Sequence, residues 1–228
     1  MAGNANVRLA GSILAGDLLN LGEAIRTCEQ AGADLLQLDV ADGHFVPTIS
    51  FGEEVVRRTC RIAKTPVEVH LMVSRPEDWV ARMAGFGLER MLFHVEASHR
   101  AMGLVQTIAA AGMKPGVAVN PETPVIAVAP MVPYLDNVCL MGIAPGFAGQ
   151  KMLDSTFVRI TKLRQVIENA GTATTITVDG GVKADNARRL VEAGADVLVV
   201  SSGIFAHPKP LESLAEIRRA VAGGRTTD

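Results

Sequence analysis

Short apolar runs and longer amphipathic segments alternate eight times along this chain, and this alternation constrains its fold more than any other feature. The apolar runs are rich in Val, Ile, Leu and Met and have the length of buried parallel strands. We expect strands at residues 7–12, 34–40, 66–71, 89–95, 115–119, 134–141, 174–179 and 196–200. We expect helices at residues 18–31, 52–63, 76–85, 99–111, 123–129, 155–170, 184–194 and 209–221.

Local signals agree with these boundaries. A glycine stands just past three of the expected helices, in AGAD (31–34), AAGM (110–113) and AGAD (193–196). Ser155 and Asp185 are candidate helix starts. Eight strand–helix units predict an α/β fold, a (β/α)8 TIM barrel. An open doubly wound sheet also alternates, but the unit count favours the barrel, and the chain has no GxGxxG motif of a dinucleotide fold.

Composition defines one domain and excludes several functions. No linker or low-complexity segment interrupts residues 7–222, so we expect a single domain over 1–228 with a frayed tail at 223–228. With 22 basic and 24 acidic residues and 4% aromatics, the chain predicts no nucleic-acid partner. Three dispersed cysteines without CxxC argue against a disulfide scaffold or a zinc finger. No signal core or membrane-length apolar run is present, which predicts no membrane contact and a cytoplasmic location.

Polar residues collect where the expected strands end. In a (β/α)8 barrel the carboxyl ends of the strands carry the chemistry. The residues at these ends are Ser12, Gln37, Asp39, His70, His94, Asn120, Met141, Asp179, Ser201 and Ser202. Because side chains alternate between the two faces of a strand, Gln37 shares a face with Asp39, and Glu68 shares one with His70. Glu68 would then lie one layer below His70 and orient a ligand.

Asp39, His70 and Asp179 form the strongest candidate set. Two carboxylates and one imidazole can hold a divalent cation and leave positions open for substrate. They can equally serve as an acid–base pair with a helping histidine. A lone aspartate before a turn is often a cap, and a lone histidine is often a satisfied core residue, but three such residues at one rim favour a site.

Glycine-bearing loops follow the last three expected strands. They are APGFAGQ (144–150), DGGVKADN (179–186) and SSGIF (201–205). A phosphate site in such barrels is commonly built by the loops after the seventh and eighth strands, where glycine lets backbone N–H groups approach an anion. Ordinary turns are the alternative. Gly146 and Gly149 flank Phe147 and suggest a hinged lid over the site, although a static loop would have the same sequence.

Motifs in order along nearly the whole chain resemble the ribulose-phosphate 3-epimerase family. They are DVADGHFVP (39–47), VHLMVSRPEDWV (69–80), FHVEAS (93–98), NPETP (120–124), APGFAGQKM (144–152) and VDGGV (178–182). The resemblance implies a (β/α)8 barrel of the ribulose-phosphate-binding type that interconverts C3 epimers of ketose phosphates, chiefly ribulose 5-phosphate and xylulose 5-phosphate. A sister group acts on allulose 6-phosphate. We also expect a homo-oligomer.

The resemblance also implies residue roles. Asp39 and Asp179 match the two catalytic aspartates, which with His70 bind one divalent metal. The metal could be Zn, Fe, Mn or Mg. The residues that match substrate-binding positions are Ser12, His70, Met72, Met141, Gly146, Phe147, Ala148, Gly149, Gly180, Gly181, Ser201 and Ser202.

Three positions depart from the family pattern. Gln37 stands where the family has a metal-binding histidine, and Ala41 stands where it has a methionine over the substrate. Ala144 replaces the Asn, Asp or Glu that usually precedes PGF. An amide oxygen is a weaker ligand than imidazole for zinc or iron, so Gln37 favours a harder cation such as Mg²⁺ or Mn²⁺. These departures leave the metal and the sugar open.

Other readings compete with an epimerase. An aldolase would need a lysine at a strand end, and a related decarboxylase would need a lysine within the cluster that follows Asp39, and neither is present. A sugar-phosphate-binding barrel without turnover, or an epimerase for another ketose phosphate such as a tetrulose phosphate, remains an alternative. We expect His94 to support the site from behind and His44 to pack in a turn.

Overall fold

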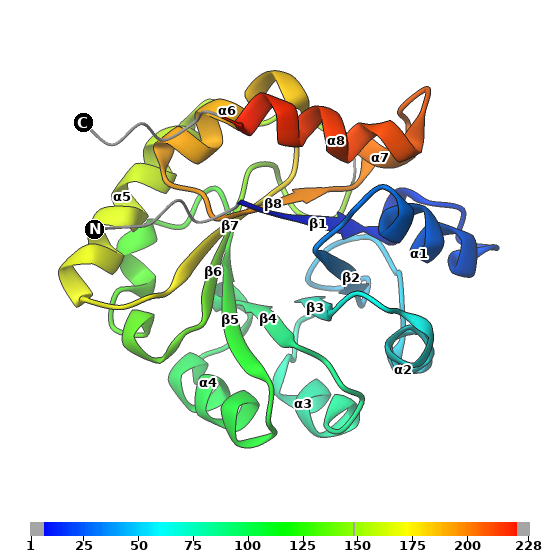
Figure 1. The fold of residues 1–228 in the computed structure, drawn as a ribbon. Helices are drawn as coiled ribbons and strands as arrows, with labels where there is room; N and C mark the ends of the chain where they lie inside the picture. The colour runs from blue at the N-terminus through cyan, green and yellow to red at the C-terminus, as the bar shows by residue number, and fades with distance from the viewer. Residues whose placement is uncertain (1–6, 148, 223–228) are drawn as a thin grey trace.

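A closed barrel of parallel strands forms the centre of the molecule in the computed structural model, which describes residues 7–147 and 149–222 (Figure 1). The strands follow one another around the barrel in chain order, and β1 closes it by pairing with β8. This confirms the predicted (β/α)8 fold and excludes the open sheet. The strands are β1 (Arg8–Ser12), β2 (Leu35–Ala41), β3 (Val67–Met72), β4 (Arg90–His94), β5 (Lys114–Val119), β6 (Asn137–Met141), β7 (Thr175–Asp179) and β8 (Val197–Val200).

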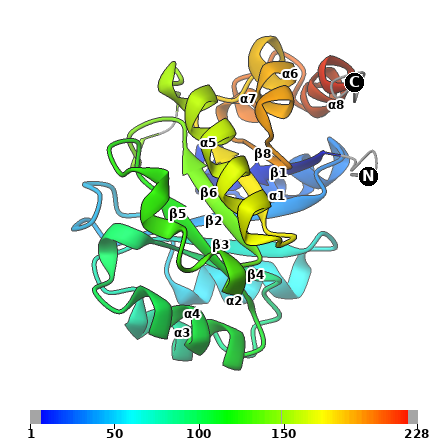
Figure 2. The ribbon, with the colours of Figure 1, turned by 90° about the vertical axis from the view of Figure 1, so that its left-hand side faces the viewer.

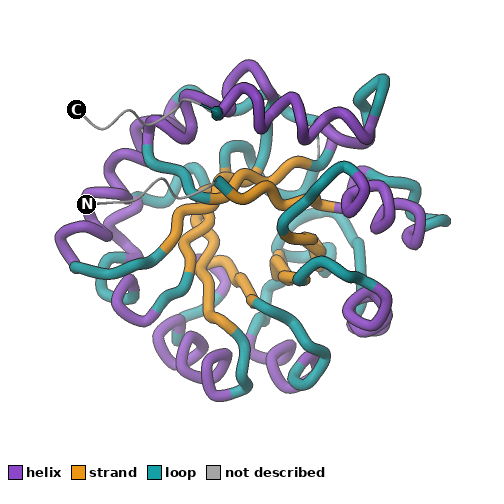
Figure 3. The backbone as a smooth tube through the Cα atoms, in the orientation of Figure 1, coloured by secondary structure: helices purple, strands orange, loops and turns teal. Residues whose placement is uncertain are grey.

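Helices cover the outside of the strand ring, as the tube view shows (Figure 3). They are α1 (Leu21–Gln30), α2 (Glu53–Ile62), α3 (Glu77–Met83), α4 (Ala101–Ala110), α5 (Ser155–Ala170), α6 (Ala184–Ala193), α7 (Ser202–Phe205) and α8 (Pro210–Val221). The side view shows α3 and α4 together at one side of the barrel and α6, α7 and α8 at the opposite side (Figure 2). Among the described residues, no helix combines the length and the apolar character that crossing a membrane requires.

The predicted helix at 123–129 is wrong. That segment contains a short 3₁₀ helix, η3 (Val125–Val128), and a second one, η4 (Val132–Tyr134), follows it. Proline at 124, 130 and 133 explains the difference, because each proline lacks a backbone N–H and disfavours a regular helix. The short α7 after β8 was not predicted either.

The predicted helix starts are displaced by one or two residues. Asp154, not Ser155, is the N-cap of α5, and Lys183, not Asp185, is the N-cap of α6. Asp185 instead lies in the first turn of α6, where its negative charge complements the helix dipole. The predicted tail at 223–228 lies outside the described residues, and the single-domain extent over 1–228 stays a prediction.

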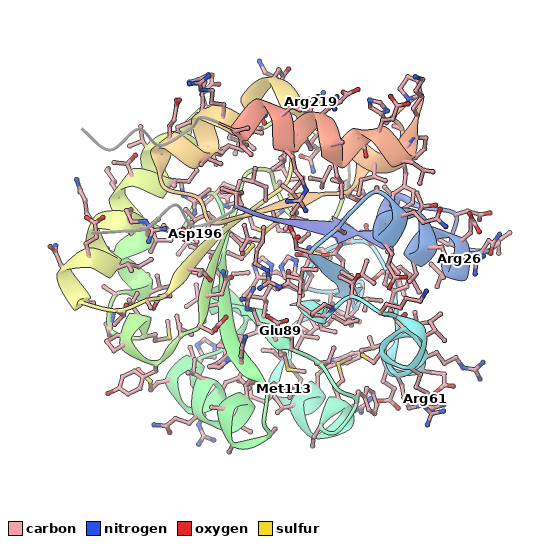
Figure 4. The ribbon with its side chains drawn as sticks, in the orientation of Figure 1. Arg26, Arg61, Glu89, Met113, Asp196 and Arg219 are labelled. Carbon is pink, nitrogen blue, oxygen red and sulfur yellow. The ribbon has the colours of Figure 1, made fainter. Side chains whose placement is uncertain are left out.

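Apolar side chains fill the space between the strands and the outer helices, whereas the barrel interior is partly polar (Figure 4). Two small apolar clusters face inward, one from β1, β2 and β8 and one from β4, β5 and β6. Between them lie Gln37, Glu68, Arg90 and Asn137, all buried. Arg90 Nη1 donates to Glu68 Oε2 at 3.0 Å, and Arg90 Nη2 contacts Asp136 Oδ2 at 2.6 Å. Buried charges need such partners, so this ion chain forms a polar floor beneath the carboxyl-terminal rim.

Candidate active site

Three strands bring Asp39, His70 and Asp179 together at the carboxyl-terminal rim. One ligand atom from each residue lies within 4.8 Å of the other two. His70 Nδ1 is 3.1 Å from Asp39 Oδ1 and 3.4 Å from Asp179 Oδ2. The parallel register brings two of the three together, because Asp39 and His70 are direct neighbours on β2 and β3. Two carboxylates and an imidazole at this spacing fit a single divalent cation.

Gln37 extends from β2 into the same cluster, and its amide nitrogen faces the acids. Gln37 Nε2 donates to Asp39 Oδ1 at 2.8 Å and to Asp179 Oδ2 at 2.7 Å. Two carboxylate oxygens around one amide group require the NH₂ side, since only that side carries hydrogens. Gln37 Oε1 is buried without a hydrogen-bond partner. The amide oxygen that would ligate a metal therefore points away from the cluster, and Gln37 acts as a hydrogen-bond bridge.

Hydrogen bonds and neighbouring charges stabilise the charged forms of Asp39 and His70, although both side chains are buried. Burial alone would raise the pKa of Asp39, but hydrogen bonds from His70, Ser12 and Gln37 and the charge of His70 outweigh burial and lower that pKa. Ser12 Oγ donates to Asp39 Oδ2 at 2.6 Å. Burial alone would lower the pKa of His70, but Asp179 and Asp39 outweigh it and raise the pKa to about 10. The arrangement thus favours an ionised Asp39.

One cavity opens above this cluster. The predicted substrate-binding residues that line it are Ser12, His70, Met72, Met141, Gly146, Phe147, Gly149, Gly180, Gly181, Ser201 and Ser202. Asp39 and Asp179 line it as well. The remaining predicted residue, Ala148, lies outside the described residues.

The sequence reasoning missed the apolar part of the cavity wall. The residues concerned are Leu14, Ile143, Pro145, Val182 and Val199. Strand parity was a usable signal for one of them, because Val199 is two residues before Ser201 and so faces the same side. Leu14 lies in a short 3₁₀ helix (Ile13–Ala15) and the others in loops, where the sequence gives no such periodicity.

The predicted phosphate loops lie on one side of the cavity. Gly180 and Gly181 have positive φ angles of 101° and 72°. A Cβ atom on Gly181 would lie 2.7 Å from the backbone nitrogen of Met152, so side chains are excluded there. Ser201 Oγ donates to the carbonyl of Ser12 at 3.1 Å, which ties this side to β1. No lysine or arginine is among the described residues that line the cavity.

The loop after β6 covers another side of the cavity. Gly146 and Gly149 have positive φ angles, and the Phe147 side chain is 58% exposed. Thr48 Oγ1 donates to the Gly146 carbonyl at 2.6 Å and joins this loop to the one after β2. The arrangement is compatible with a hinged lid, and hinge motion stays a prediction.

Glu68 does not touch the cluster, contrary to expectation. Its carboxylate is bound by Arg90, which the sequence could not pair with it before the strand register was known. Burial is the largest influence on Glu68 and raises its pKa to about 7, against the lowering effect of Arg90. His44 lies in the turn after β2, as expected, with Nδ1 3.0 Å from the Asp42 carbonyl oxygen. His94 contacts His70, as expected for a supporting residue.

Comparison with known proteins places this geometry in a family. Residues 8–205 match the ribulose-phosphate 3 epimerase family. The chain is 39% identical over 197 residues to the ribulose-phosphate 3-epimerase of Aquifex aeolicus, covering 86% of this chain and 89% of that one. It is 40% identical over 205 residues to the enzyme of that name from Rhodobacter capsulatus, covering 90% and 89%.

Solved structures with low identity share the fold alone. A 3-hexulose-6-phosphate synthase matches with a TM-score of 0.67 at 18% identity, covering 94% of this chain and 99% of that one. The orotidine 5'-phosphate decarboxylase of Pyrococcus horikoshii matches with a TM-score of 0.68 at 15% identity, covering 94% and 99%. The sequence identity to the epimerases is more than twice as high as the identity to these structures. The chain therefore belongs to the ribulose-phosphate 3-epimerase family and is an isomerase of the epimerase type.

Proposed function

We propose that this chain interconverts the C3 epimers of a ketose phosphate, with D-ribulose 5-phosphate and D-xylulose 5-phosphate as the first candidates. The observation that carries the proposal is the pair Asp39 and Asp179, which reach one cavity from β2 and β7. Epimerisation beside a carbonyl requires that a proton leaves one face of C3 and that another arrives at the opposite face. Two carboxyl groups on separate strands suit these two roles.

The surroundings of Asp39 indicate its starting state. Ser12, Gln37 and His70 all hydrogen-bond to Asp39 and favour its ionised form. Asp39 therefore removes the C3 proton in one direction, and proton transfer at the opposite face falls to the carboxyl group of Asp179. The roles exchange in the reverse direction. The substrate passes through an ene-diolate, whose negative charge must be stabilised by the site.

Asp39, His70 and Asp179 would hold one divalent cation, and the donor set fits such an ion. When bound, it supplies Lewis-acid stabilisation of negative charge on the substrate oxygens. Since Gln37 presents nitrogen rather than oxygen, the protein offers two carboxylates and a single imidazole. This oxygen-rich set supports Mn²⁺ or Mg²⁺ more than the family's histidine would, with Zn²⁺ and Fe²⁺ as the alternatives.

The remaining cavity residues would position the substrate. Gly180, Gly181, Ser201 and Ser202 would bind the phosphate, largely through backbone N–H groups. Met72 and Met141 would flank the carbon chain. Their thioethers offer apolar surface without a competing acid or base. Ala41 packs with Met72, and its small side chain supports a second candidate, an epimerase for a different ketose phosphate such as allulose 6-phosphate or a tetrulose phosphate.

A substrate screen in D₂O tests the proposal. Tetrulose, pentulose and hexulose phosphates are incubated with the enzyme and one added divalent cation, and C3 epimers and C3 deuterium are measured by NMR. We expect one phosphate to be epimerised with deuterium incorporated at C3. Binding without epimerisation or exchange would instead indicate a sugar-phosphate-binding barrel. Epimerisation without exchange would contradict the two-aspartate proton transfer.

A homo-oligomer is part of the proposal as well. Exposed apolar side chains on the loops after β1 and β2 support it, with Leu19 fully exposed and Ile49 79% exposed. Exposed apolar side chains that gather on one face of a protein often mark an interface. Sedimentation equilibrium of the purified chain tests this point, and a purely monomeric protein at micromolar concentration would contradict it.

A further inference from the structure

His94 lies behind the metal-binding triad, fully buried at the end of β4. Its Nε2 atom is 2.9 Å from Nε2 of His70. The two ring planes differ by only 22° while the ring centroids are 4.9 Å apart. The nitrogen edges therefore meet nearly in plane, which is the geometry of a hydrogen bond and not of face-to-face stacking.

This contact has room for one hydrogen only. His70 presents Nδ1 to the two acids, so Nδ1 is its ligand atom for a cation. A neutral imidazole that ligates through Nδ1 carries its hydrogen on Nε2. His70 must then be the donor in the contact, and His94 Nε2 must be the acceptor.

The position of the hydrogen on His70 also determines which nitrogen of His94 carries a hydrogen. A neutral ring that accepts through Nε2 carries its hydrogen on Nδ1. That atom is buried and lacks a close partner, but Glu96 Oε2 is 3.5 Å away. Asn120 Oδ1 is a second buried acceptor without a partner, and the Asn120 side chain interacts with His94. The backbone N–H of Asn120 fixes Glu96 by donating to Oε1 at 2.8 Å.

We propose that His94 is a positioning residue that, together with Glu96 and Asn120, directs the His70 hydrogen away from the cavity and keeps Nδ1 available for a cation. The hydrogen bond between the two histidines thus has one direction, from His70 to His94, and the acceptors near His94 Nδ1 lie just after β4 and β5. Such partners behind a ligating histidine fix its tautomer and ring orientation. The inference deepens the proposed function, since it concerns the same cation site, but it can be tested without any sugar.

The tautomer of His94 is measured in the wild-type chain, which avoids any folding defect. Protein labelled with ¹⁵N-histidine is examined by long-range ¹H–¹⁵N NMR with Zn²⁺ added. We expect His94 Nδ1 to show the shift of a protonated nitrogen and His94 Nε2 that of an unprotonated one. The opposite pattern, with the hydrogen on His94 Nε2, would overturn the proposal.

Zn²⁺ affinity of the metal-free protein, measured by calorimetry, tests the consequence. His94→Phe keeps a ring without an acceptor and should weaken binding by about 10–100-fold, the usual effect of losing such a partner. His94→Gln supplies an amide oxygen that can accept from His70 and should restore most of the affinity. The exposed Glu122→Gln serves as the matched control and should bind as the wild type does.

Two results would refute the role of His94. One is a His94→Phe variant that binds Zn²⁺ as tightly as the wild type. The other is an equal loss in His94→Phe and His94→Gln, which would show that the acceptor is not the cause. A chain that shows the expected tautomer and affinities but epimerises no ketose phosphate would contradict the proposed function and leave this inference intact.

Discussion

Replacing Gln37 by methionine should destabilise the metal-free protein, because methionine keeps the length of the side chain and removes its donor. Gln37 Nε2 makes two hydrogen bonds to carboxylates, at 2.7 and 2.8 Å. A hydrogen bond to a charged group contributes about 1.5–3 kcal/mol, so the pair contributes about 3–6 kcal/mol. The same change removes the unpartnered Oε1, which recovers about 1–3 kcal/mol. The midpoints of these two ranges give an expected net loss of about 2–3 kcal/mol in the free energy of unfolding.

Urea denaturation in EDTA, followed by circular dichroism, measures this loss by linear extrapolation. Gln165→Met is the matched control, since Gln165 is exposed on α5 and should tolerate the same substitution with little change. Asp39 keeps its hydrogen bonds from Ser12 and His70, so the fold itself should survive. A loss below about 0.5 kcal/mol in Gln37→Met would show that the amide does not hold the two acids together.

The other predictions concern metal, catalysis and phosphate. The Gln37→His variant should bind Zn²⁺ about tenfold or more tightly than the wild type does in calorimetry, because it adds an imidazole ligand. If the wild type binds Zn²⁺ at least as tightly as this variant, a histidine at position 37 does not improve the metal site. Asp39→Asn and Asp179→Asn should each lower kcat by about 10²-fold or more, and near-normal turnover in either would contradict the mechanism. Gly181→Ala should cost more stability than Gly32→Ala, because both have positive φ but only Gly181 meets backbone atoms, and equal losses in thermal unfolding would contradict this reasoning. The unphosphorylated sugar should have a much lower kcat/KM than its phosphate, and equal values would remove the phosphate site.

Much of the fold could be predicted from the sequence, because each strand has its own apolar pattern and strands that follow one another in the chain are neighbours in the barrel. Apolar runs separated by amphipathic segments located all the strands, and the barrel rule then placed Asp39, His70 and Asp179 at one rim. The error at 123–129 came from weighing apolar spacing above proline. Three prolines within or beside that segment remove the N–H donors on which an α-helix depends.

Contacts between strands were much harder to predict. Glu68 was expected to support a ligand, but its partner Arg90 is 22 residues away and becomes visible only with the register of β3 and β4. The orientation of the Gln37 amide is a similar case. The sequence shows that an amide is present, but only the positions of the Asp39 and Asp179 oxygens decide which end faces the cluster.

The polar floor explains how so many charges coexist inside one barrel. Glu68 lies two residues before His70 on the inward face of β3, so an unpaired carboxylate there would add negative charge directly beneath two acids. Arg90 compensates that charge and is itself shared with Asp136. Buried ion pairs of this kind contribute little net stability, although breaking one costs about 3–5 kcal/mol. Its benefit is therefore electrostatic separation: Arg90 compensates the buried Glu68, the Asp136 side chain is 30% exposed to solvent, and the charge at the rim is left to Gln37, His70 and ligands.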